Sequence, residues 1–264
     1  MDLRAVSGLP LSLGECGLVF GEGLSEVEPA CRRLSDARYA FAADDAGGIE
    51  ELYFMYRDVG MCEHRSVMRD LGLRYDVTVI MPGVVGGEFN KTVGHYHPVK
   101  AGTGMTYPEV YEVLHGEATY LMQRQAAFRK RPATSDGGRA TSDIDDAYVV
   151  VARPGDKVVI PPGYGHVTIN AGGEVLVMAN WVASEFESVY GEYRALRGGA
   201  YYLFKRGDGR EWAVNPNYAQ VAPLRFVQAT DYPEFGLVKG VPMYMLIATA
   251  PEKLRWLTHP KEHK

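Results

Sequence analysis

Short runs of β-branched residues, separated by turns rich in glycine and proline, fill the middle of the chain. They cover Tyr148–Val151, Lys157–Ile160, His166–Ile169 and Glu174–Val182. Runs of this length and spacing are typical of a β-sandwich or β-barrel, whereas β–α–β units need long helical crossovers. The sequence therefore predicts a mainly β protein.

Earlier segments add strands to the same architecture. They are Ile49–Tyr56, Leu71–Met81, Glu109–Leu114 and Glu117–Gln123. Within the second of these, Tyr75, Val77 and Val79 alternate with other residues, which places two sets of side chains on opposite faces of a strand. A small barrel built from such strands leaves a cavity wide enough for one ligand.

Two histidines, His95 and His97, stand two residues apart in a segment that we interpret as a strand. Because side chains i and i+2 of a strand lie on one face, both imidazoles point to the same place. Glu109 and His166, from two other predicted strands, complete a set of three nitrogens and one oxygen. We choose Glu109 over Glu112 because the Glu109-Val-Tyr string fits the motif described below, and because Glu109 and Tyr111 share one face of the strand while Glu112 lies on the other. This set suits one divalent first-row ion per subunit: iron, manganese, nickel or zinc.

Composition excludes several classes of protein. With 264 residues, 46% of them hydrophobic and 23% charged, the chain has the make-up of a globular protein, and no apolar run reaches membrane length. A net charge of −5 argues against nucleic acid as a partner. Cys16, Cys31 and Cys62 form no Cys-x-x-Cys pair, and no signal peptide is evident at the N-terminus. We expect a cytoplasmic protein with reduced thiols and no membrane partner.

The chain divides around the predicted barrel, which we place at residues 49–197 with a polar surface insert at 124–146. Residues 1–48 are expected to form an N-terminal arm, with a short helix over Ser25–Leu34 because acidic residues precede basic ones there. Residues 198–264 are expected to form an extension docked on the barrel. Its predicted elements are strands at Ala200–Lys205, Trp212–Val214 and Met243–Ala250 and a helix at Glu252–Leu257.

Three motifs resemble the paired signatures of the cupin superfamily: Gly94-His95-Tyr96-His97, Glu109-Val-Tyr-Glu-Val-Leu-His-Gly116 and Pro154-Gly-Asp-Lys-Val-Val-Ile-Pro-Pro-Gly163 with His166 and Asn170. Within the superfamily, the segments Thr92–His97, Pro108–Ala118 and Pro161–Asn170 closely resemble the cupin-type phosphoglucose isomerases of archaea and some bacteria. This resemblance implies a double-stranded β-helix, or jelly-roll, barrel.

The family resemblance implies a hexose phosphate substrate. D-glucose 6-phosphate and D-fructose 6-phosphate would be interconverted, a step of glycolysis and gluconeogenesis, by a homodimer. A metal ion with three histidines and a carboxylate keeps two open positions for sugar oxygens, and it would acidify the C–H bond between them. Glu109 is then the candidate for proton transfer, Tyr111 the hydroxyl donor beside it, and Tyr190 a further pocket residue.

The resemblance assigns the phosphate to Thr78, Thr92 and the backbone N–H of Gly94. In a regular strand Thr92 and Gly94 would lie on the face opposite His95 and His97, so we expect a bulge at Gly94. Two positions depart from the family pattern. Val182 and Ser188 stand where a tyrosine and a histidine are expected. Phosphate binding and ring opening are therefore expected to use other residues.

Two other functions fit the same motifs. A cupin oxygenase would use the four ligands with iron and would consume dioxygen, and Thr78 and Thr92 would not matter to it. A non-catalytic sugar-binding cupin would have no use for the ligands. The intact set of His95, His97, Glu109 and His166 argues against the second alternative.

Overall fold

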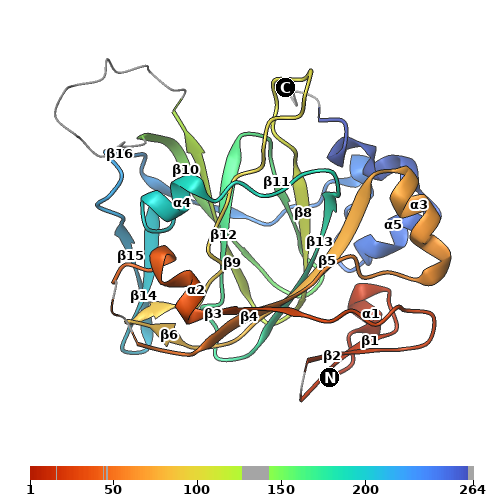
Figure 1. Ribbon diagram of the computed structural model, residues 1–264, viewed down its shortest axis with the longest axis horizontal. Coiled ribbons are helices and arrows are strands. Elements are labelled where there is room, and N and C mark those ends of the chain that lie inside the picture. The colour runs from red at the N-terminus through yellow and green to blue at the C-terminus, as the bar shows by residue number, and fades with distance from the viewer. Residues whose placement is uncertain (16, 44, 46, 127–142, 261–264) are drawn as a thin grey trace.

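Two largely antiparallel sheets face each other and form a barrel (Figure 1). The computed structural model describes residues 1–15, 17–43, 45, 47–126 and 143–260. The mainly β barrel predicted from the sequence is confirmed. One sheet has the order β11 (Lys157–Ile160), β8 (Glu109–His115), β13 (Leu176–Ala183), β5 (Leu73–Ile80), β4 (Glu51–Tyr56) and β3 (Ala30–Arg33).

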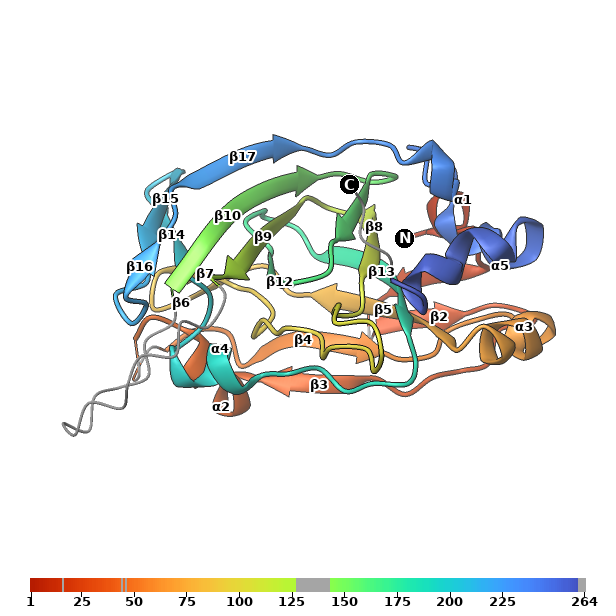
Figure 2. The same cartoon turned by 90° about the horizontal axis from the view of Figure 1, so that it is seen from above.

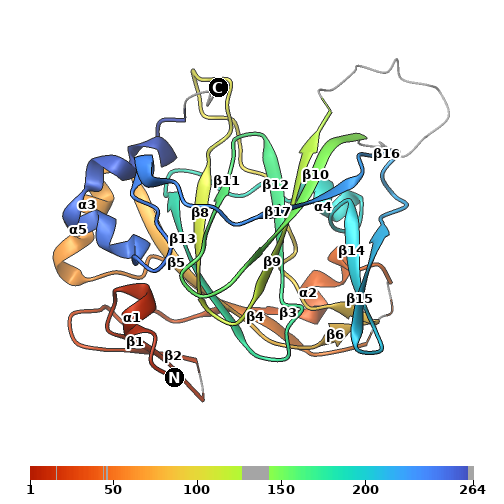
Figure 3. The same cartoon turned by 180° about the vertical axis from the view of Figure 1, so that it is seen from behind.

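The facing sheet has the order β12 (Tyr164–Ile169), β9 (Ala118–Gln125), β10 (Asp143–Ala152) and β16 (Gln220–Val221), and β17 (Leu224–Gln228) also pairs with β10. Viewed from above, the two sheets lie as layers, with β17 and β10 on one side and β4 and β3 on the other (Figure 2). Seen from behind, β17 crosses the outside of the barrel toward the C-terminal helices (Figure 3).

Both faces of β5 and β13 are buried. On the outer face, the rings of Tyr75 and Trp181 meet edge to face with centroids 4.8 Å apart, and Tyr244 of the C-terminal segment lies 5.0 Å from Tyr75. Such aromatic pairs contribute about 0.5–1.5 kcal/mol beyond their area burial. On the inner face, the cross-strand pair Ile80–Leu176 is apolar, whereas the pair Asp76–Asn180, nearer the other end, is polar. The sheet therefore gathers polar groups at one end of the barrel interior.

The N-terminal residues begin with α1 (Arg4–Ser7) and the hairpin of β1 (Leu11–Gly14) and β2 (Gly17–Phe20). The helix predicted over Ser25–Leu34 is wrong. β3 pairs with β4 in that segment, and α2 (Leu34–Ala37) and the 3-10 helix η1 (Arg38–Ala40) follow it. Pro29 explains the difference, because proline within a helix removes a hydrogen-bond donor and clashes with the preceding turn.

The segment from residue 198 onward adds strands and helices. The two strands predicted first are present as β14 (Tyr201–Arg206) and β15 (Gly209–Val214), in a sheet with β7 (Glu88–Phe89) and β6 (Val84–Val85). The strand predicted over Met243–Ala250 is wrong, since 3-10 helix η4 (Met243–Met245) and α5 (Leu246–Thr249) occupy it. A short apolar run does not distinguish a strand from a buried helix. The terminal helix is present as η5 (Pro251–Leu257).

The remaining helices are short. They are η2 (Cys62–His64), α3 (Arg65–Asp70), α4 (Gly191–Ala195) and η3 (Pro233–Phe235). In the described part of the chain, every helix lacks the combination of length and apolar character that crossing a lipid bilayer requires. The predicted insert at 124–146 begins and ends as strand, because β9 runs to Gln125 and β10 starts at Asp143, while residues 127–142 lie outside the described residues.

A buried ion pair joins the barrel to the C-terminal segment. Lys157 Nζ lies 2.8 Å from Glu112 Oε1, and both side chains are 0% exposed. The same ammonium donates to the carbonyl oxygens of Val238 and Val241 at 2.8 and 2.6 Å. Glu112 Oε2 accepts the backbone N–H of Met243 at 2.9 Å. The C-terminal segment is therefore fastened to β8 and β11.

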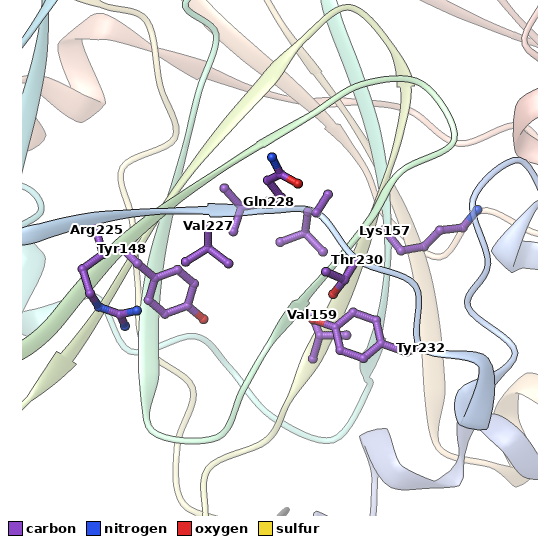
Figure 4. A pocket seen from close by; sticks show the side chains of 11 residues that line it. Tyr148, Lys157, Val159, Arg225, Val227, Gln228, Thr230 and Tyr232 are labelled. Atoms are coloured by element: carbon purple, nitrogen blue, oxygen red, sulfur yellow. The ribbon is translucent and has the colours of Figure 1, made fainter.

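A pocket of about 240 Å³ lies between β17, β10 and β11. Figure 4 shows Arg225 and Tyr148 at one end of it and Lys157 and Tyr232 at the other. None of the residues predicted to bind metal or substrate lines this pocket. The predicted site lies instead in the barrel interior.

Candidate active site

Three histidines and one glutamate meet inside the barrel. His95 and His97 come from the connection between β7 and β8, Glu109 begins β8, and His166 lies on β12. One ligand atom from each lies within 4.8 Å of those of the others. Reciprocal backbone hydrogen bonds of 3.2 and 3.1 Å join His95 to His166 and fix their spacing. The structure thus brings together the four residues that the sequence indicates as metal ligands.

The tautomer of His97 is set by a backbone carbonyl. Its Nδ1 lies 2.7 Å from the oxygen of Tyr107, which can only accept a hydrogen bond, so Nδ1 carries the proton. The lone pair of Nε2 then faces the other ligands, 3.3 Å from Nε2 of His95. Metal-binding histidines are usually oriented in this way by a partner on the second ring nitrogen.

The other two imidazoles are neutral at pH 7. Burial lowers the pKa of His95 well below its ordinary value, and burial lowers the pKa of His166 to about 4. A neutral imidazole offers a nitrogen lone pair, which is the form that binds metal ions.

The two carboxylate oxygens of Glu109 differ: one accepts a hydrogen bond and the other has no hydrogen-bond donor. Oε1 accepts a 2.6 Å hydrogen bond from Nδ2 of Asn180. Oε2 is buried without a hydrogen-bond donor and lies 3.3 and 3.4 Å from Nε2 of His97 and His166. Burial alone would raise the pKa of Glu109, but the close approach of the His97 and His166 imidazoles to its carboxylate outweighs burial and holds the pKa below its ordinary value.

This donor set fits a divalent metal ion. Nitrogen lone pairs and a buried carboxylate oxygen point at one place, and the carboxylate oxygen has no other partner. An uncompensated buried charge is costly, and a cation between the four groups would compensate it. Nitrogen and oxygen ligands in this ratio are typical of borderline first-row ions.

Tyr111 lies beside the ligands as a hydroxyl donor. Its Oη is 3.1 Å from Nε2 of His166. Burial, followed by the charge of Glu109, raises the pKa of Tyr111 well above 10, so the phenol keeps its proton. Glu112, the rejected alternative to Glu109, points to the other face of β8 and pairs with Lys157.

Gly94 breaks the strand expected over residues 92–97. The segment makes only isolated bridges, and Gly94 has a φ of +77°. A Cβ at this position would lie 2.5 Å from the ring of Tyr193 and 2.7 Å from Val167, so only glycine fits. This left-handed turn resolves the conflict of faces, because Thr92 and Gly94 line the same cavity as His95.

A single cavity of about 430 Å³ contains all the predicted site residues. Its lining includes Thr78, Thr92, Gly94, His95, His97, Glu109, Tyr111, His166 and Tyr190. The ring of Tyr190 lies 5.5 Å from that of His95. Thr92 Oγ1 accepts the N–H of Thr168 at 3.0 Å and still has its own hydroxyl hydrogen to donate.

The sequence did not predict several polar residues of this cavity: Tyr53, Arg57, Arg74, Asp76, Asn180 and Glu187. The sequence could have indicated Asn180, because it is the only amide side chain in the otherwise apolar run Leu176–Ala183. Nothing in the sequence indicated Arg57. It directly follows β4, and its position in the cavity depends on how β4 pairs with β5.

Comparisons with known proteins agree with the geometry. The family model described as glucose-6-phosphate isomerase matches residues 33–220. A glucose-6-phosphate isomerase of Thermococcus gammatolerans is 29% identical over 222 residues, which cover 83% of this chain and 100% of the relative. The enzyme of the same name from Thermococcus litoralis is 31% identical over 163 residues, covering 61% of this chain and 73% of the relative.

A solved structure described as a predicted oxalate decarboxylase from Thermotoga maritima also matches. It is 17% identical, covers 59% of this chain and 91% of its own, and has a TM-score of 0.33. The family model spans more than half of the 264 residues. This chain therefore belongs to the glucose-6-phosphate isomerase family.

Proposed function

We propose that this chain is a metal-dependent isomerase that interconverts D-glucose 6-phosphate and D-fructose 6-phosphate. The observation that carries the proposal is that the candidate metal ligands and the candidate phosphate ligands line one cavity. The family to which the chain belongs gives the substrate, because its relatives carry the name glucose-6-phosphate isomerase.

The residues have distinct roles in this proposal. His95, His97, His166 and Glu109 hold one divalent first-row ion, iron, manganese, nickel or zinc, which supplies Lewis acidity to the oxygens on C1 and C2. Glu109 takes the proton from C2 of the aldose and returns it to C1, while Asn180 keeps its carboxylate oriented. Tyr111 gives its hydroxyl proton to the oxygen on C1 and takes the proton of the hydroxyl on C2, so the C1 carbonyl becomes a hydroxyl and the C2 hydroxyl becomes a carbonyl.

The remaining residues bind the substrate. Thr78 and Thr92 donate hydroxyl hydrogens to the phosphate, and the N–H of Gly94 gives a backbone donor. Tyr190 forms the wall of the cavity beside His95. These groups carry no formal charge, and a positive group nearby would strengthen their hold on a phosphate.

The proposal is tested with the metal-loaded protein and fructose 6-phosphate, using a dehydrogenase to oxidise the glucose 6-phosphate formed. A chelator should lower the rate at least about a hundredfold, because Lewis-acid stabilisation is worth several kcal/mol. Added divalent metal should restore the rate. Absence of turnover with every first-row ion tried would contradict the proposal, and metal-dependent oxygen uptake would identify an oxygenase instead.

We also propose that the chain forms a homodimer, as the family resemblance implies. The exposed apolar residues Val151 and Phe226, on the neighbouring strands β10 and β17, offer an outer surface for such a contact. Sedimentation velocity should give twice the mass of one chain. A monomeric mass at micromolar concentration would rule the dimer out.

A further inference from the structure

Two arginines and an aspartate line the cavity beside the candidate metal ligands. They are Arg57, Arg74 and Asp76. The strand register places Asp76 opposite Asn180 and Arg74 opposite Val182. Arg57 follows the last residue of β4, and its Nη1 lies 3.4 Å from Oδ2 of Asp76. The three charged side chains therefore form one cluster, which we call the Arg57 cluster.

The cluster lies where the cavity lacks an expected polar group. Val182 stands at a position where the family resemblance expects a tyrosine. Residues directly opposite in an antiparallel pair have Cβ atoms about 5 Å apart. Arg74 is the direct neighbour of Val182, so β5 brings a charged group beside the apolar Val182 of β13.

Asp76 acts as a support, because all its hydrogen-bonding positions are used. Oδ1 accepts the N–H of Asp58 and Nε of Arg74, both at 2.8 Å. Oδ2 accepts Nε of Arg74 at 3.0 Å and Nη1 of Arg57 at 3.4 Å. The side chain is only 8% exposed. Asp76 is therefore suited to orient the arginines and unsuited to remove a proton from a substrate.

Arg57 is held loosely and keeps most of its donors available. Its ion pair with Asp76 is long, and its side chain is 48% exposed. Its Nη2 lies 3.6 Å from the sulfur of Met55, so the guanidinium turns back along β4. Met55 is the cross-strand partner of Thr78, and the guanidinium therefore points toward a candidate phosphate ligand.

The two arginines and the one aspartate give the Arg57 cluster a net charge of +1. Asp76 compensates one arginine, and the second is available to an anion in the cavity. The guanidinium presents several N–H donors in a planar fork that matches the geometry of phosphate oxygens. The threonine hydroxyls and the glycine N–H contribute no charge against a dianion.

We propose that Arg57, oriented by Asp76 and Arg74, is the cationic ligand of the substrate phosphate and determines specificity for phosphorylated sugars. This inference rests on the proposed function for the identity of the substrate. It assigns to this chain a charged phosphate contact in place of the polar groups missing at Val182 and Ser188.

The test compares Arg57→Ala and Arg57→Lys with Arg210→Ala. Arg210 is a matched control, because its side chain is 42% exposed, it pairs with Glu117 at 3.1 Å and it does not line the cavity. Arg57→Ala should raise KM for fructose 6-phosphate about 10- to 100-fold with kcat within about threefold, as loss of a charged hydrogen bond predicts. Arg57→Lys should recover part of the affinity, and Arg210→Ala should behave as the unsubstituted protein.

A binding measurement keeps the inference separate from the proposed function. Inorganic phosphate is titrated calorimetrically into the metal-loaded protein, and its Kd should rise in Arg57→Ala by the same factor as KM. If the unsubstituted protein shows no isomerisation, the proposed function fails and this titration still decides the role of Arg57. Equal phosphate affinity in both proteins, or a fall in kcat at constant KM, would overturn the inference.

Asp76→Asn provides a second variant if Arg57→Ala does not fold. It keeps the size of the side chain but removes the charge that orients Arg57, so KM and the Kd of phosphate should rise together by a smaller factor. The content of bound metal should stay constant in all these variants. Loss of metal in Asp76→Asn, with unchanged phosphate affinity, would show that the cluster supports the ligands instead and would overturn the inference.

Discussion

Replacing His97 with alanine is expected to remove the metal ion and the activity together. The substitution removes one of four ligands and leaves Glu109 Oε2 without one of its two close imidazole neighbours. Activity should fall about a thousandfold, which corresponds to the several kcal/mol of stabilisation that a catalytic metal supplies. Metal content after dialysis and the coupled assay measure the two effects.

Tyr111→Phe separates metal binding from chemistry. It removes a hydroxyl and no candidate ligand, so metal content should stay constant while kcat falls about a hundredfold, as expected for loss of one positioned donor. His115→Ala is the control, because His115 also lies on β8 but outside the ligand set. If Tyr111→Phe loses as much metal as His97→Ala, Tyr111 has no separate role in proton transfer.

Lys157→Met should cause the largest loss of stability. It leaves the carboxylate of Glu112 buried beside an apolar side chain and takes a donor from the carbonyl groups of Val238 and Val241. Breaking a buried pair on one side costs about 3–5 kcal/mol. For a chain of this size the midpoint of thermal unfolding should fall by roughly 10 °C. Chemical and thermal denaturation measure the change.

The loss should depend on pH in a defined direction. Burial already raises the pKa of Glu112 to about 7 in the native protein. Without Lys157 the folded pKa rises further above the unfolded value, so the folded state binds the extra proton and the destabilisation shrinks as pH falls. Adding Glu112→Gln to Lys157→Met should restore part of the stability. Lys239→Met is the control, since its ion pair with Asp156 is 62% exposed on the lysine side and worth less than about 1 kcal/mol. Equal effects of both lysine substitutions would contradict the role of the buried pair.

The sequence predicted the features that depend on local spacing. The alternation of residues along β5 predicted which side chains lie on each of its two faces. The two-residue spacing of His95 and His97 indicated a shared ligand position. The choice of Glu109 over Glu112 combined strand parity with the Glu-Val-Tyr motif, and the structure places Glu109 with the ligands and Glu112 with Lys157. The two histidines meet as expected although their segment makes only isolated bridges.

Features that depend on strand pairing were not predictable. Arg57 and Asp76 meet because β4 and β5 pair in one particular register, which no single segment encodes. The helix expected over Ser25–Leu34 from the order of its charges does not form, because Pro29 disfavours a helix there. Gly94 was expected to distort the backbone, but its left-handed conformation and the close packing of Tyr193 against it depend on the tertiary structure.

The parallel pairing of β10 with β17 has a consequence for synthesis of the chain. Ala147 pairs with Leu224 and Val151 with Gln228, so one edge of the second sheet is completed by residues made long after β10. Until residue 228 has left the ribosome, the backbone donors and acceptors along that edge of β10 have no strand partner. A nascent chain stalled before β17 should therefore be recognised by chaperones that bind exposed strand edges, and release should follow once that strand is added.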